Sequence, residues 1–312
     1  MAIAVVGNVF VDIKGFPEGA YIPAGRNAGH VETVHGGVGR NVAEDIANME
    51  LRPRFVSMVD NTAEGMEVIN KLKRHRIDTR YVIPTEDGMG IWLAIFDSTG
   101  DIAASISKRP KMEALIKLIE EKGDEIFADV DSIVIEIDMD KEIVKRIFGY
   151  AQKYNKPIYA VVANMSIATE RRDFLRRVDC FVCNEQEAEI LFAEDFSHLD
   201  RGELCDALSG KLEEADFNSI VVTMGSQGAV YAARNGDKGC VEAMKVAVKD
   251  TTGAGDAFFA GVAVGLTYGK PLVDAVRIGT RLASAVITSS ENVCPRFQST
   301  EFGIEAAGAD NE

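Results

Sequence analysis

The sequence predicts an α/β protein with a mostly parallel central sheet, helices on both faces of that sheet, and a small additional β-sheet. Short continuous apolar runs recur along the chain and alternate with segments of helical periodicity, which is typical of parallel strands buried on both faces. The chain has 312 residues, of which 46% are hydrophobic. That length suits one large α/β domain with a smaller appendage, and its core needs no disulfide or metal for stability.

Each element of the core is predicted from its own apolar run or periodicity. The runs predict strands at residues 3–6, 54–59, 132–137, 157–162, 180–183 and 219–224. Apolar residues three and four positions apart predict helices at residues 39–49, 65–75, 112–122, 141–154, 185–192 and 205–214. The last third carries mainly helix signals, at residues 256–266 and 271–289, before an expected frayed polar end at 306–312.

Two stretches do not follow this alternation. Residues 9–35 are rich in Gly and Pro, and residues 89–107 alternate apolar and polar side chains around the turn STGD at 98–101, which is a hairpin signal. We interpret the two stretches as a small β-sheet that acts as a lid. The nucleotide- and substrate-binding core then comprises residues 1–8, 36–88 and 108–312. The alternative is that both stretches form an ordinary antiparallel edge of the main sheet.

Composition excludes several classes of function. The formal net charge is −15, from 34 Lys and Arg against 49 Asp and Glu, and it opposes binding to nucleic acid and to anionic membranes. No apolar run reaches the roughly 18 residues of a membrane span. The start, MAIAVVGNVF, lacks a basic segment and a cleavage site, so we interpret it as a first strand and not a signal peptide. Five scattered cysteines suit reduced thiols, and we expect a cytoplasmic protein.

The strongest candidate for a catalytic segment is KDTTGAGDAFF, residues 249–259. Gly253, Ala254 and Gly255 precede a predicted helix, where small residues let backbone N–H groups approach a phosphate that the helix dipole also favours. The charge of Asp256 would oppose an anion. It makes sense if Asp256 is a general base that takes a proton from the hydroxyl attacking that phosphate. The alternative is a glycine turn in which Asp256 caps the helix.

A second glycine segment, HGGVGRN at residues 35–41, precedes another predicted helix. Gly36 and Gly37 let the backbone reach a small ligand, and Asn41 offers a donor and acceptors to sugar hydroxyls. The segment is neither a Walker A loop nor a dinucleotide fingerprint, since the chain has no GxxxxGK[ST] and no GxGxxG after its first strand. The alternative is an ordinary strand-to-helix turn.

Polar residues at other strand ends are further candidates. Asp12 follows the first strand and can accept hydrogen bonds from a vicinal diol, or it is a solvated turn residue. Asn184 and Glu187 lie where a strand gives way to a helix. Asn184 is a candidate phosphate contact and Glu187 a candidate to organise Mg²⁺ through water, although the pair also fits a capping box. The segment TMGSQG, residues 223–228, follows an apolar strand, where α/β sheets bind ligands.

Taken together, these segments resemble the ribokinase-like (PfkB) family of carbohydrate and nucleoside kinases. HGGVGRN is similar to the N-terminal signature of the family, DTTGAGDAFFAG to its C-terminal signature, and Asn184-x-x-Glu187 to its N-x-x-E motif. The resemblance runs over essentially the whole chain. It implies a three-layer ribokinase-like fold with a β-sheet lid, ATP as phosphate donor, Mg²⁺, and phosphorylation of a hydroxyl on a sugar or nucleoside.

The resemblance also implies a role for each matching residue. Asp256 is the implied base, with Gly253, Ala254 and Gly255 as the anion hole. The implied acceptor contacts are Asp12, Gly36, Gly37 and Asn41. The implied nucleotide contacts are Asn184, Thr223, Gly225 and Gly228. Asp250 and Thr252 match positions that in some members surround a monovalent cation such as K⁺. Because lids in the family often pair, a homodimer through the lid is also implied.

Within the family, GGVGRN is most similar to pseudouridine kinases, whereas ribokinases usually carry Lys where Val38 stands. The resemblance therefore implies pseudouridine as the acceptor and pseudouridine 5'-phosphate as the product. An apolar face on the lid hairpin suits a covered base, and we expect it at Ile91, Trp92, Leu93, Ile95 and Phe96.

Three charged residues bear on the choice of acceptor. Asp138, at the end of a strand, is a further candidate sugar contact. Lys108 and Arg109 follow the lid hairpin, where a neutral nucleoside needs no cations. They leave a ribokinase- or fructokinase-type sugar kinase, or a sugar-phosphate kinase, as alternatives. A non-catalytic nucleotide or nucleoside sensor on the same fold is the alternative outside enzymes.

Overall fold

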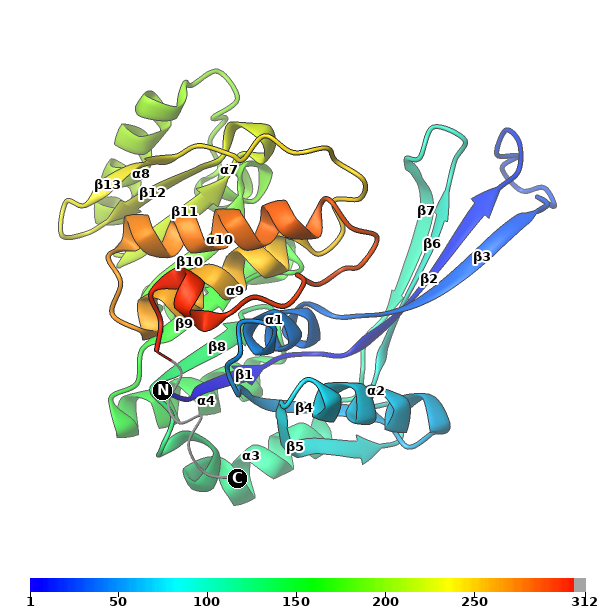
Figure 1. Cartoon of the computed structure of the whole chain (residues 1–312), viewed down its shortest axis with the longest axis horizontal. Coiled ribbons are helices and arrows are strands. Elements are labelled where there is room, and N and C mark those ends of the chain that lie inside the picture. Colours follow the sequence, from blue (N-terminus) through cyan, green and yellow to red (C-terminus); the bar gives the residue numbers. More distant parts are fainter. Residues whose placement is uncertain (306–312) are drawn as a thin grey trace.

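The apolar runs form a nine-stranded central sheet in the computed structural model, which describes residues 1–305 (Figure 1). The strand order is β13 (Lys238–Val241), β12 (Ala229–Ala233), β11 (Ser219–Thr223), β10 (Cys180–Asn184), β9 (Ile158–Val161), β8 (Ser132–Glu136), β1 (Ile3–Val6), β4 (Arg54–Asp60) and β5 (Asp78–Thr85). In this order, all strands from β11 through β1 to β5 run parallel to one another. Strands β12 and β13 form an antiparallel edge beside β11. The polar end expected at 306–312 lies outside the described residues.

Helices cover both faces of this sheet because successive side chains of a strand point to opposite faces. Ile3 and Val5 of β1 pack in one core, and Ala4 and Val6 pack in the other. The first core is covered by α1 (Val38–Ala47), α2 (Ala63–Arg74), α9 (Ala254–Thr267) and α10 (Leu272–Val286). The second is covered by α3 (Glu113–Phe127), α4 (Lys141–Tyr154), α7 (Glu185–Phe192) and α8 (Arg201–Ala215). These three layers confirm the predicted fold class.

Shorter helical segments complete the core. They are α5 (Met165–Ala168), α6 (Arg172–Leu175) and the 3₁₀ turns η1 (Thr169–Arg171), η2 (Gly225–Gln227) and η3 (Ser299–Phe302). All six predicted strands are present, whereas β5, β12 and β13 were not predicted. Their sequences explain the omission, since β5 contains Pro84, β12 has three Ala among its five residues, and β13 has only four residues, one of them Gly. Helix α3 runs five residues beyond its predicted end.

The two irregular stretches form a separate four-stranded sheet, which projects from the main domain (Figure 1). Its order is β3 (Gly29–Gly36), β2 (Phe10–Pro17), β6 (Gly90–Phe96) and β7 (Ile102–Lys108). The turn between β6 and β7 is closed by a hydrogen bond from the Asp97 N–H to the Asp101 carbonyl, 2.8 Å. These strands are not in the ladder of the main sheet, so the alternative of an ordinary sheet edge is wrong. The role of the small sheet as a lid stays a prediction.

The described residues also bear on membranes and disulfides. Among residues 1–305, every helix is too short or too polar to span a bilayer. All five cysteines are free thiols, and four of them are buried.

Candidate active site

The glycine turn before α9 leaves helix amides open to a ligand. Gly253 has φ +79°, and a Cβ there would lie 2.1 Å from the Asn292 carbonyl oxygen, so only glycine fits. Helix α9 begins at Ala254, and no side chain caps it. The N–H groups of Gly255 and Asp256 donate to no backbone acceptor within residues 1–305. Open amides at the positive end of a helix form a site for a phosphate.

Asp256 lies in the first turn of α9, and it does not cap that helix. Its Oδ2 accepts a hydrogen bond from Asn41 Nδ2 of α1, at 2.6 Å, so the capping alternative is wrong. Burial raises the pKa of Asp256 to about 6, and the negative charges of Asp12 and Glu187 add to that rise. The Asn41 hydrogen bond and the Arg40 charge oppose it. A carboxyl that titrates near neutral pH suits general-base chemistry.

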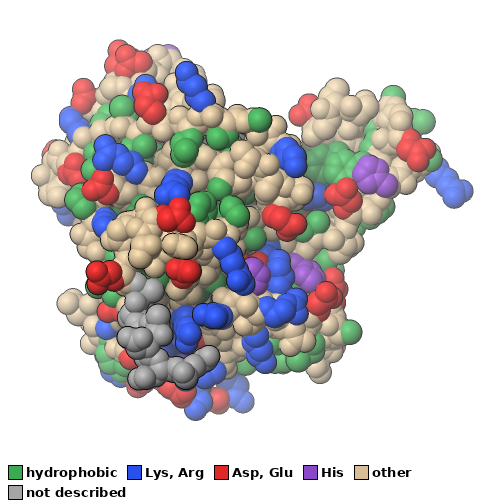
Figure 2. All heavy atoms as spheres, viewed as in Figure 1, with side chains coloured by type: hydrophobic (Ala, Val, Ile, Leu, Met, Phe, Trp, Pro, Cys, Tyr) green, Lys and Arg blue, Asp and Glu red, His purple; other side chains and the backbone are tan. Residues whose placement is uncertain are grey.

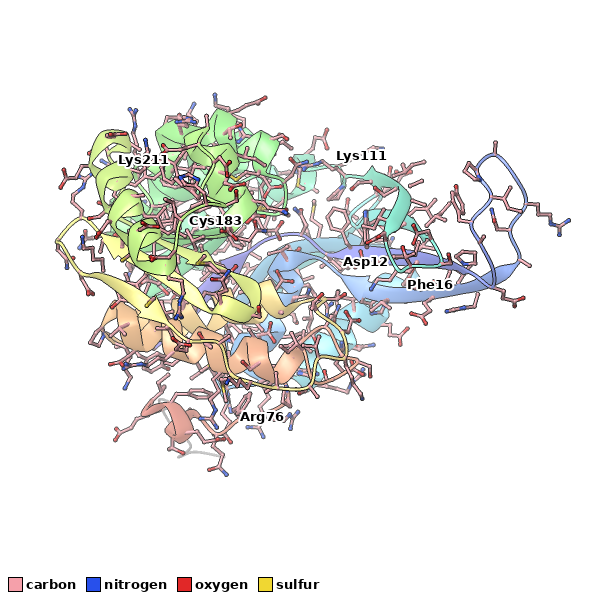
Figure 3. All side chains as sticks on the ribbon, turned by 90° about the horizontal axis from the view of Figure 1, so that it is seen from above. Asp12, Phe16, Arg76, Lys111, Cys183 and Lys211 are labelled. Carbon is pink, nitrogen blue, oxygen red and sulfur yellow. The ribbon has the colours of Figure 1, made fainter. Side chains whose placement is uncertain are left out.

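The diglycine segment brings β2 and β3 close to the start of α1. Gly37 has φ +97°, and a Cβ there would lie 2.5 Å from the Asn8 carbonyl oxygen. At Gly36 a Cβ would lie 2.2 Å from Asp12 Oδ2, so the missing side chain makes room for this carboxylate. Burial raises the pKa of Asp12. Figure 3 shows Asp12 near the base of the projecting sheet and Phe16 farther out.

Two buried charged residues beside these turns were missed by the sequence analysis. Arg40 is fully buried, and it donates from Nη1 to Glu44 Oε1 (2.8 Å) and from Nε to the Gly36 carbonyl (3.3 Å). Glu136 ends β8, and its Oε1 accepts from the Gly39 N–H at 2.6 Å. Burial raises the pKa of Glu136 to about 8. Both groups hold the diglycine segment in place. The sequence did hold a signal for each: Arg40 is a charged residue inside the glycine segment HGGVGRN, and Glu136 is a charged residue inside an apolar run.

Asp138 is buried beside the site and already has partners. Its Oδ1 accepts from the Ala163 N–H at 3.0 Å. Arg109 donates from Nη1 to the Asp138 carbonyl at 3.2 Å, and Nη2 lies 3.5 Å from Oδ2 of the same residue. Lys108 instead pairs with Asp87 at 2.7 Å. The two cations therefore diverge and neutralise carboxylates of this chain.

Asn184 and Glu187 form the capping box that the sequence also allowed. Asn184 Oδ1 accepts from the Glu187 N–H at 2.9 Å, and Glu187 Oε2 accepts from the Asn184 N–H at 2.8 Å. Burial, together with the negative charge of Asp138, raises the pKa of Glu187. The negative charge of Glu187 also raises the pKa of Asp256, so this cap lies near the start of α9, although α7 and α9 cover opposite faces of the sheet. The second carboxylate oxygen of Glu187 has no hydrogen-bond partner within residues 1–305.

A cavity of about 780 Å³ lies beside the start of α9, and of the predicted nucleotide contacts Thr223, Gly225 and Gly228 line it, whereas Asn184 does not. Gly228 has φ +93°, and a Cβ there would lie 2.0 Å from the Val241 carbonyl oxygen. The lining residues that the sequence singled out are Thr223, Gly225, Gly228, Ala254 and Gly255. Apolar side chains that line the cavity include Met244, Val246, Phe258 and Ile287. An apolar cavity ending at open helix amides suits a base with a phosphate tail.

The predicted cation positions lie at the edge of this region. Asp250 Oδ1 accepts from the Thr252 N–H at 2.8 Å, and both residues are exposed. Nowhere in residues 1–305 do three or more His, Cys, Asp or Glu residues gather into a group able to hold a metal ion. The monovalent-cation site stays a prediction.

The two faces of the small sheet differ, because side chains alternate along each strand. Asp12 is paired with Trp92 across β2 and β6, so the two share a face. Ile13, Leu93 and Ile106 lie in one row on the opposite face. The expected apolar face therefore divides: Trp92 and Phe96 lie on the Asp12 side, and Ile91, Leu93 and Ile95 lie on the other. Only the first two can meet a ligand held at Asp12.

The fold and site together define a sugar or nucleoside kinase of the ribokinase-like class. A model of the pfkB family carbohydrate kinases matches residues 2–294. The chain belongs to this family, so it is a phosphotransferase with a hydroxyl acceptor. The resemblance read from the sequence is confirmed, and the alternative of a non-catalytic sensor is wrong.

Individual relatives differ in the acceptor that their names give. The chain is 36% identical over 294 residues to a guanosine-inosine kinase of Exiguobacterium acetylicum, covering 93% of this chain and 95% of the relative. It is 24% identical to a pseudouridine kinase of Escherichia coli, covering 92% and 90%. A solved ribokinase of Arabidopsis thaliana, complexed with ribose and ATP, superposes with a TM-score of 0.83 at 22% identity, covering 97% and 99%.

Proposed function

We propose that this protein is an ATP-dependent nucleoside kinase whose acceptor is a purine nucleoside such as guanosine or inosine. The observation that carries the proposal is the pairing of Asn41 with Asp256, whose neighbour Gly255 lines the cavity beside α9. The purine acceptor is supported by the 36% identity to a guanosine-inosine kinase. Pseudouridine, the expectation from GGVGRN, is the second candidate, supported by the more distant relative.

In this mechanism the base of ATP occupies the cavity and its phosphates meet the amides of Gly255 and Asp256. The acceptor hydroxyl lies between Asp256 and the γ-phosphate. Asp256 takes the hydroxyl proton as the oxygen attacks, the bond from the γ-phosphorus to the bridging oxygen breaks, and ADP leaves. The helix amides stabilise the charge on the transferring group. Asp12 and Asn41 hold the sugar hydroxyls, and closure of the small sheet excludes water.

The residues present fit a water-held Mg²⁺. Mg²⁺ keeps most of its waters and binds substrate phosphates, so it needs no cluster of protein ligands. Glu187 would hold those waters through its free carboxylate oxygen. The ion supplies charge neutralisation for the phosphates when bound.

A panel of acceptors tests the proposal. ATP consumption should be measured with inosine, guanosine, pseudouridine, uridine, ribose, fructose and fructose phosphates. We expect kcat/KM to be at least about tenfold higher for a purine nucleoside than for ribose, the order of effect of one or two extra contacts. Turnover of fructose phosphate with none on any nucleoside would overturn the proposed acceptor. Preferred turnover of pseudouridine would select the second candidate.

Replacing Arg109 should have little effect on KM for a neutral acceptor. The Arg109 guanidinium is half-exposed and already bonded to Asp138, so we expect Arg109→Ala to change KM for inosine by less than about fivefold, the usual worth of an exposed ion pair. The Lys108→Ala variant, whose side chain pairs with Asp87, is the matched control. A rise in KM of tenfold or more, seen only with a phosphorylated acceptor, would favour a sugar-phosphate kinase.

Replacing Trp92 should raise KM for nucleosides but not for free sugars. Because Trp92 shares a face of the small sheet with Asp12, we expect Trp92→Ala to raise KM for the nucleoside by about tenfold, since stacking on a base is worth about 1–3 kcal/mol. KM for ribose should stay within about twofold. Leu93→Ala, on the opposite face, is the control and should leave both values unchanged. Equal effects of the two variants would contradict a base contact.

The pH dependence should report the ionisation of Asp256. Asp256 works as a base only when it is ionised, and burial raises its pKa from 3.8 to about 6. We therefore expect kcat/KM for the acceptor, measured at saturating ATP, to be level above pH 7 and to fall as the pH drops through about 6. The residual activity of Asp256→Asn provides the comparison. An acidic limb of the same midpoint and depth in that variant would assign the titration to another group.

The small sheet also bears the proposed homodimer contact. Val31 and Ile106 are 69% and 70% exposed on the face opposite Asp12. Pairing of two such faces would bury both side chains and leave the Asp12 face free.

A further inference from the structure

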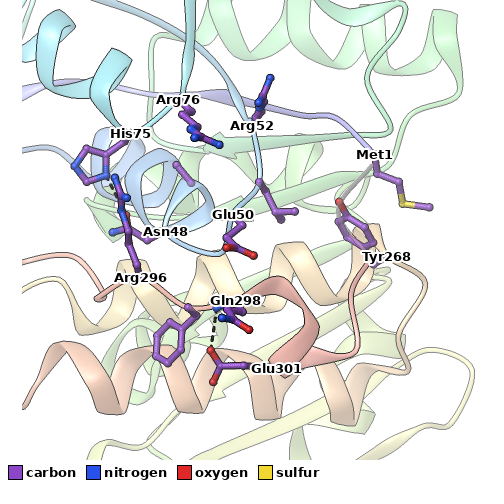
Figure 4. Close-up of a pocket in the computed structure, with 13 residues that line it drawn as sticks. Met1, Asn48, Glu50, Arg52, His75, Arg76, Tyr268, Arg296, Gln298 and Glu301 are labelled. Carbon is purple, nitrogen blue, oxygen red and sulfur yellow. Dashed lines mark hydrogen bonds between the residues drawn. The ribbon is translucent and has the colours of Figure 1, made fainter. Parts of the chain in front are cut away.

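A second cavity, of about 600 Å³, lies where α1 and α2 end, against the segment at residues 296–301 (Figure 4). None of its lining residues lines the cavity beside α9, and the proposed reaction uses none of them. Its volume is within the roughly 300–1,000 Å³ of cavities that bind small molecules. A cavity of this size with no role in the proposed reaction is a candidate site for another ligand.

The charges around this cavity are mainly positive and free. Arg52, Arg76 and Arg296 line it, all three are exposed, and within residues 1–305 their guanidinium groups make no hydrogen bond or ion pair. The two acids of the cavity are engaged. Glu50 Oε2 accepts from the Ser299 N–H at 3.2 Å, and Glu301 pairs with an arginine of α10. Figure 2 shows Lys and Arg side chains gathered on this part of the surface, although the chain carries a net charge of −15.

The carbonyl groups at the two helix ends do not cancel this positive charge, because they already accept hydrogen bonds. At the end of α2 the Leu72 and Lys73 carbonyls accept from the His75 and Arg76 N–H groups, at 3.1 and 2.9 Å. At the end of α1 the Asn48 carbonyl accepts from the Phe297 N–H at 2.7 Å.

A buried polar atom without a partner marks one end of the cavity. The Tyr268 hydroxyl is buried and bonds to no other group among residues 1–305. In Figure 4, Tyr268 lies at one end and His75 at the other, with Arg52 and Arg76 along one side between them. The Phe297 ring also lines the cavity. The cavity thus offers phosphate-binding cations and aromatic side chains along its length.

We propose that this cavity is a second ligand site, which binds an organic phosphate of nucleotide size. The planar guanidinium groups of Arg52, Arg76 and Arg296 match phosphate oxygens and are the side chains best suited to bind them. The organic part of the ligand extends along the cavity toward Tyr268. Binding here needs neither the glycine turn nor Asp256.

The ligand site is connected to the active site by a continuous set of contacts. The segment that carries Arg296 also carries Cys294 and Asn292. The Cys294 carbonyl accepts from Asn48 Nδ2 of α1 at 2.6 Å, and the Cys294 N–H donates to Asp45 Oδ1 at 2.6 Å. The Asn292 carbonyl lies directly against the Gly253 turn. A ligand that fixes Arg296 therefore acts on both α1 and the start of α9, and it changes the kinetics of the kinase.

Binding measurements on the full chain test the site. Inorganic phosphate, ribose 5-phosphate and AMP serve as probes in titration calorimetry with wild type, Asp256→Asn and the triple variant Arg52→Ala/Arg76→Ala/Arg296→Ala. Arg74→Ala is the matched control, because Arg74 is an exposed arginine of α2 that does not line the cavity. We expect at least one organic phosphate to bind wild type, Asp256→Asn and Arg74→Ala alike, and at least tenfold more weakly to the triple variant.

The same probe should change KM for the acceptor or kcat by at least twofold in wild type and not in the triple variant. The three arginines are exposed, so the triple variant should fold, and its thermal melting and its kcat without the probe report this directly. Equal binding to wild type and the triple variant, or no binding of any probe at millimolar concentration, overturns the site. Binding lost equally in Arg74→Ala reduces the effect to bulk charge and also overturns it. A probe that binds at the arginines with no kinetic effect overturns the connection to the active site.

Discussion

Replacing Asp256 by Asn should lower kcat by roughly 10²–10⁴, the usual worth of general-base catalysis. Asn has nearly the size of Asp but cannot take the hydroxyl proton. ATP should still bind, because the amides of Gly255 and Asp256 belong to the backbone, and removing a negative charge beside the phosphates favours binding. The free energy of unfolding should change by less than about 1 kcal/mol, since Asn can still accept the hydrogen bond of Asn41 through its side-chain oxygen.

Steady-state kinetics and thermal melting of the same preparations measure this effect. Asp274→Asn is the matched control, because Asp274 also lies in the first turn of a helix, α10, but is bonded there to Arg277 on the surface. It should retain wild-type kcat. A folded Asp256→Asn protein with wild-type turnover would remove Asp256 from the mechanism and leave an anion-binding turn alone.

Replacing Gly253 by Ala should have the second largest effect. The new Cβ would lie 2.1 Å from the Asn292 carbonyl oxygen, and the φ of +79° is unfavourable for any side chain, so the turn must move. Moving it displaces the amides that stabilise the transferring phosphate. We expect kcat/KM to fall by about 10²–10³, comparable to the loss of an oxyanion-hole donor. The free energy of unfolding should fall by about 1–3 kcal/mol.

Gly255→Ala is the control that distinguishes backbone strain at Gly253 from the mere loss of a glycine in this turn. A Cβ at Gly255 meets nothing within 4 Å, and this residue lies in the helix, where Ala is favoured over Gly. Its thermal stability should equal or exceed that of wild type. If Gly253→Ala melted like wild type and kept full activity, the glycine turn would not be the geometric basis of the anion site.

The local pattern of apolar and polar residues was sufficient to predict much of the fold. Six strands and the helices that cover them follow from runs and periodicities of about ten residues, because burial on both faces requires continuous apolar residues. Strands β12 and β13 were missed since Ala and Gly give a weak strand signal, and their pairing with β11 supplies what local propensity does not.

Part of the candidate site could also be predicted from the local sequence. Gly37 and Gly253 were found because a positive φ at a tight turn demands glycine, which leaves a mark in the sequence itself. Glu136 was missed because it lies in an apolar run as one acidic residue. Burial, together with the negative charge of Asp138, raises its pKa to about 8, and the hydrogen bond from the Gly39 N–H, nearly a hundred residues earlier, opposes that rise.

The sequence by itself determined the three-layer fold, the two glycine turns and the residue types of a kinase site. Only the tertiary structure decided which residues meet. Asn41 bonds to Asp256 across 215 positions of the chain, Arg109 is bound to Asp138, and Trp92 shares a face with Asp12. Periodicity and turn chemistry act over one or two turns of chain, whereas these contacts depend on how distant elements pack and on which charges are buried together.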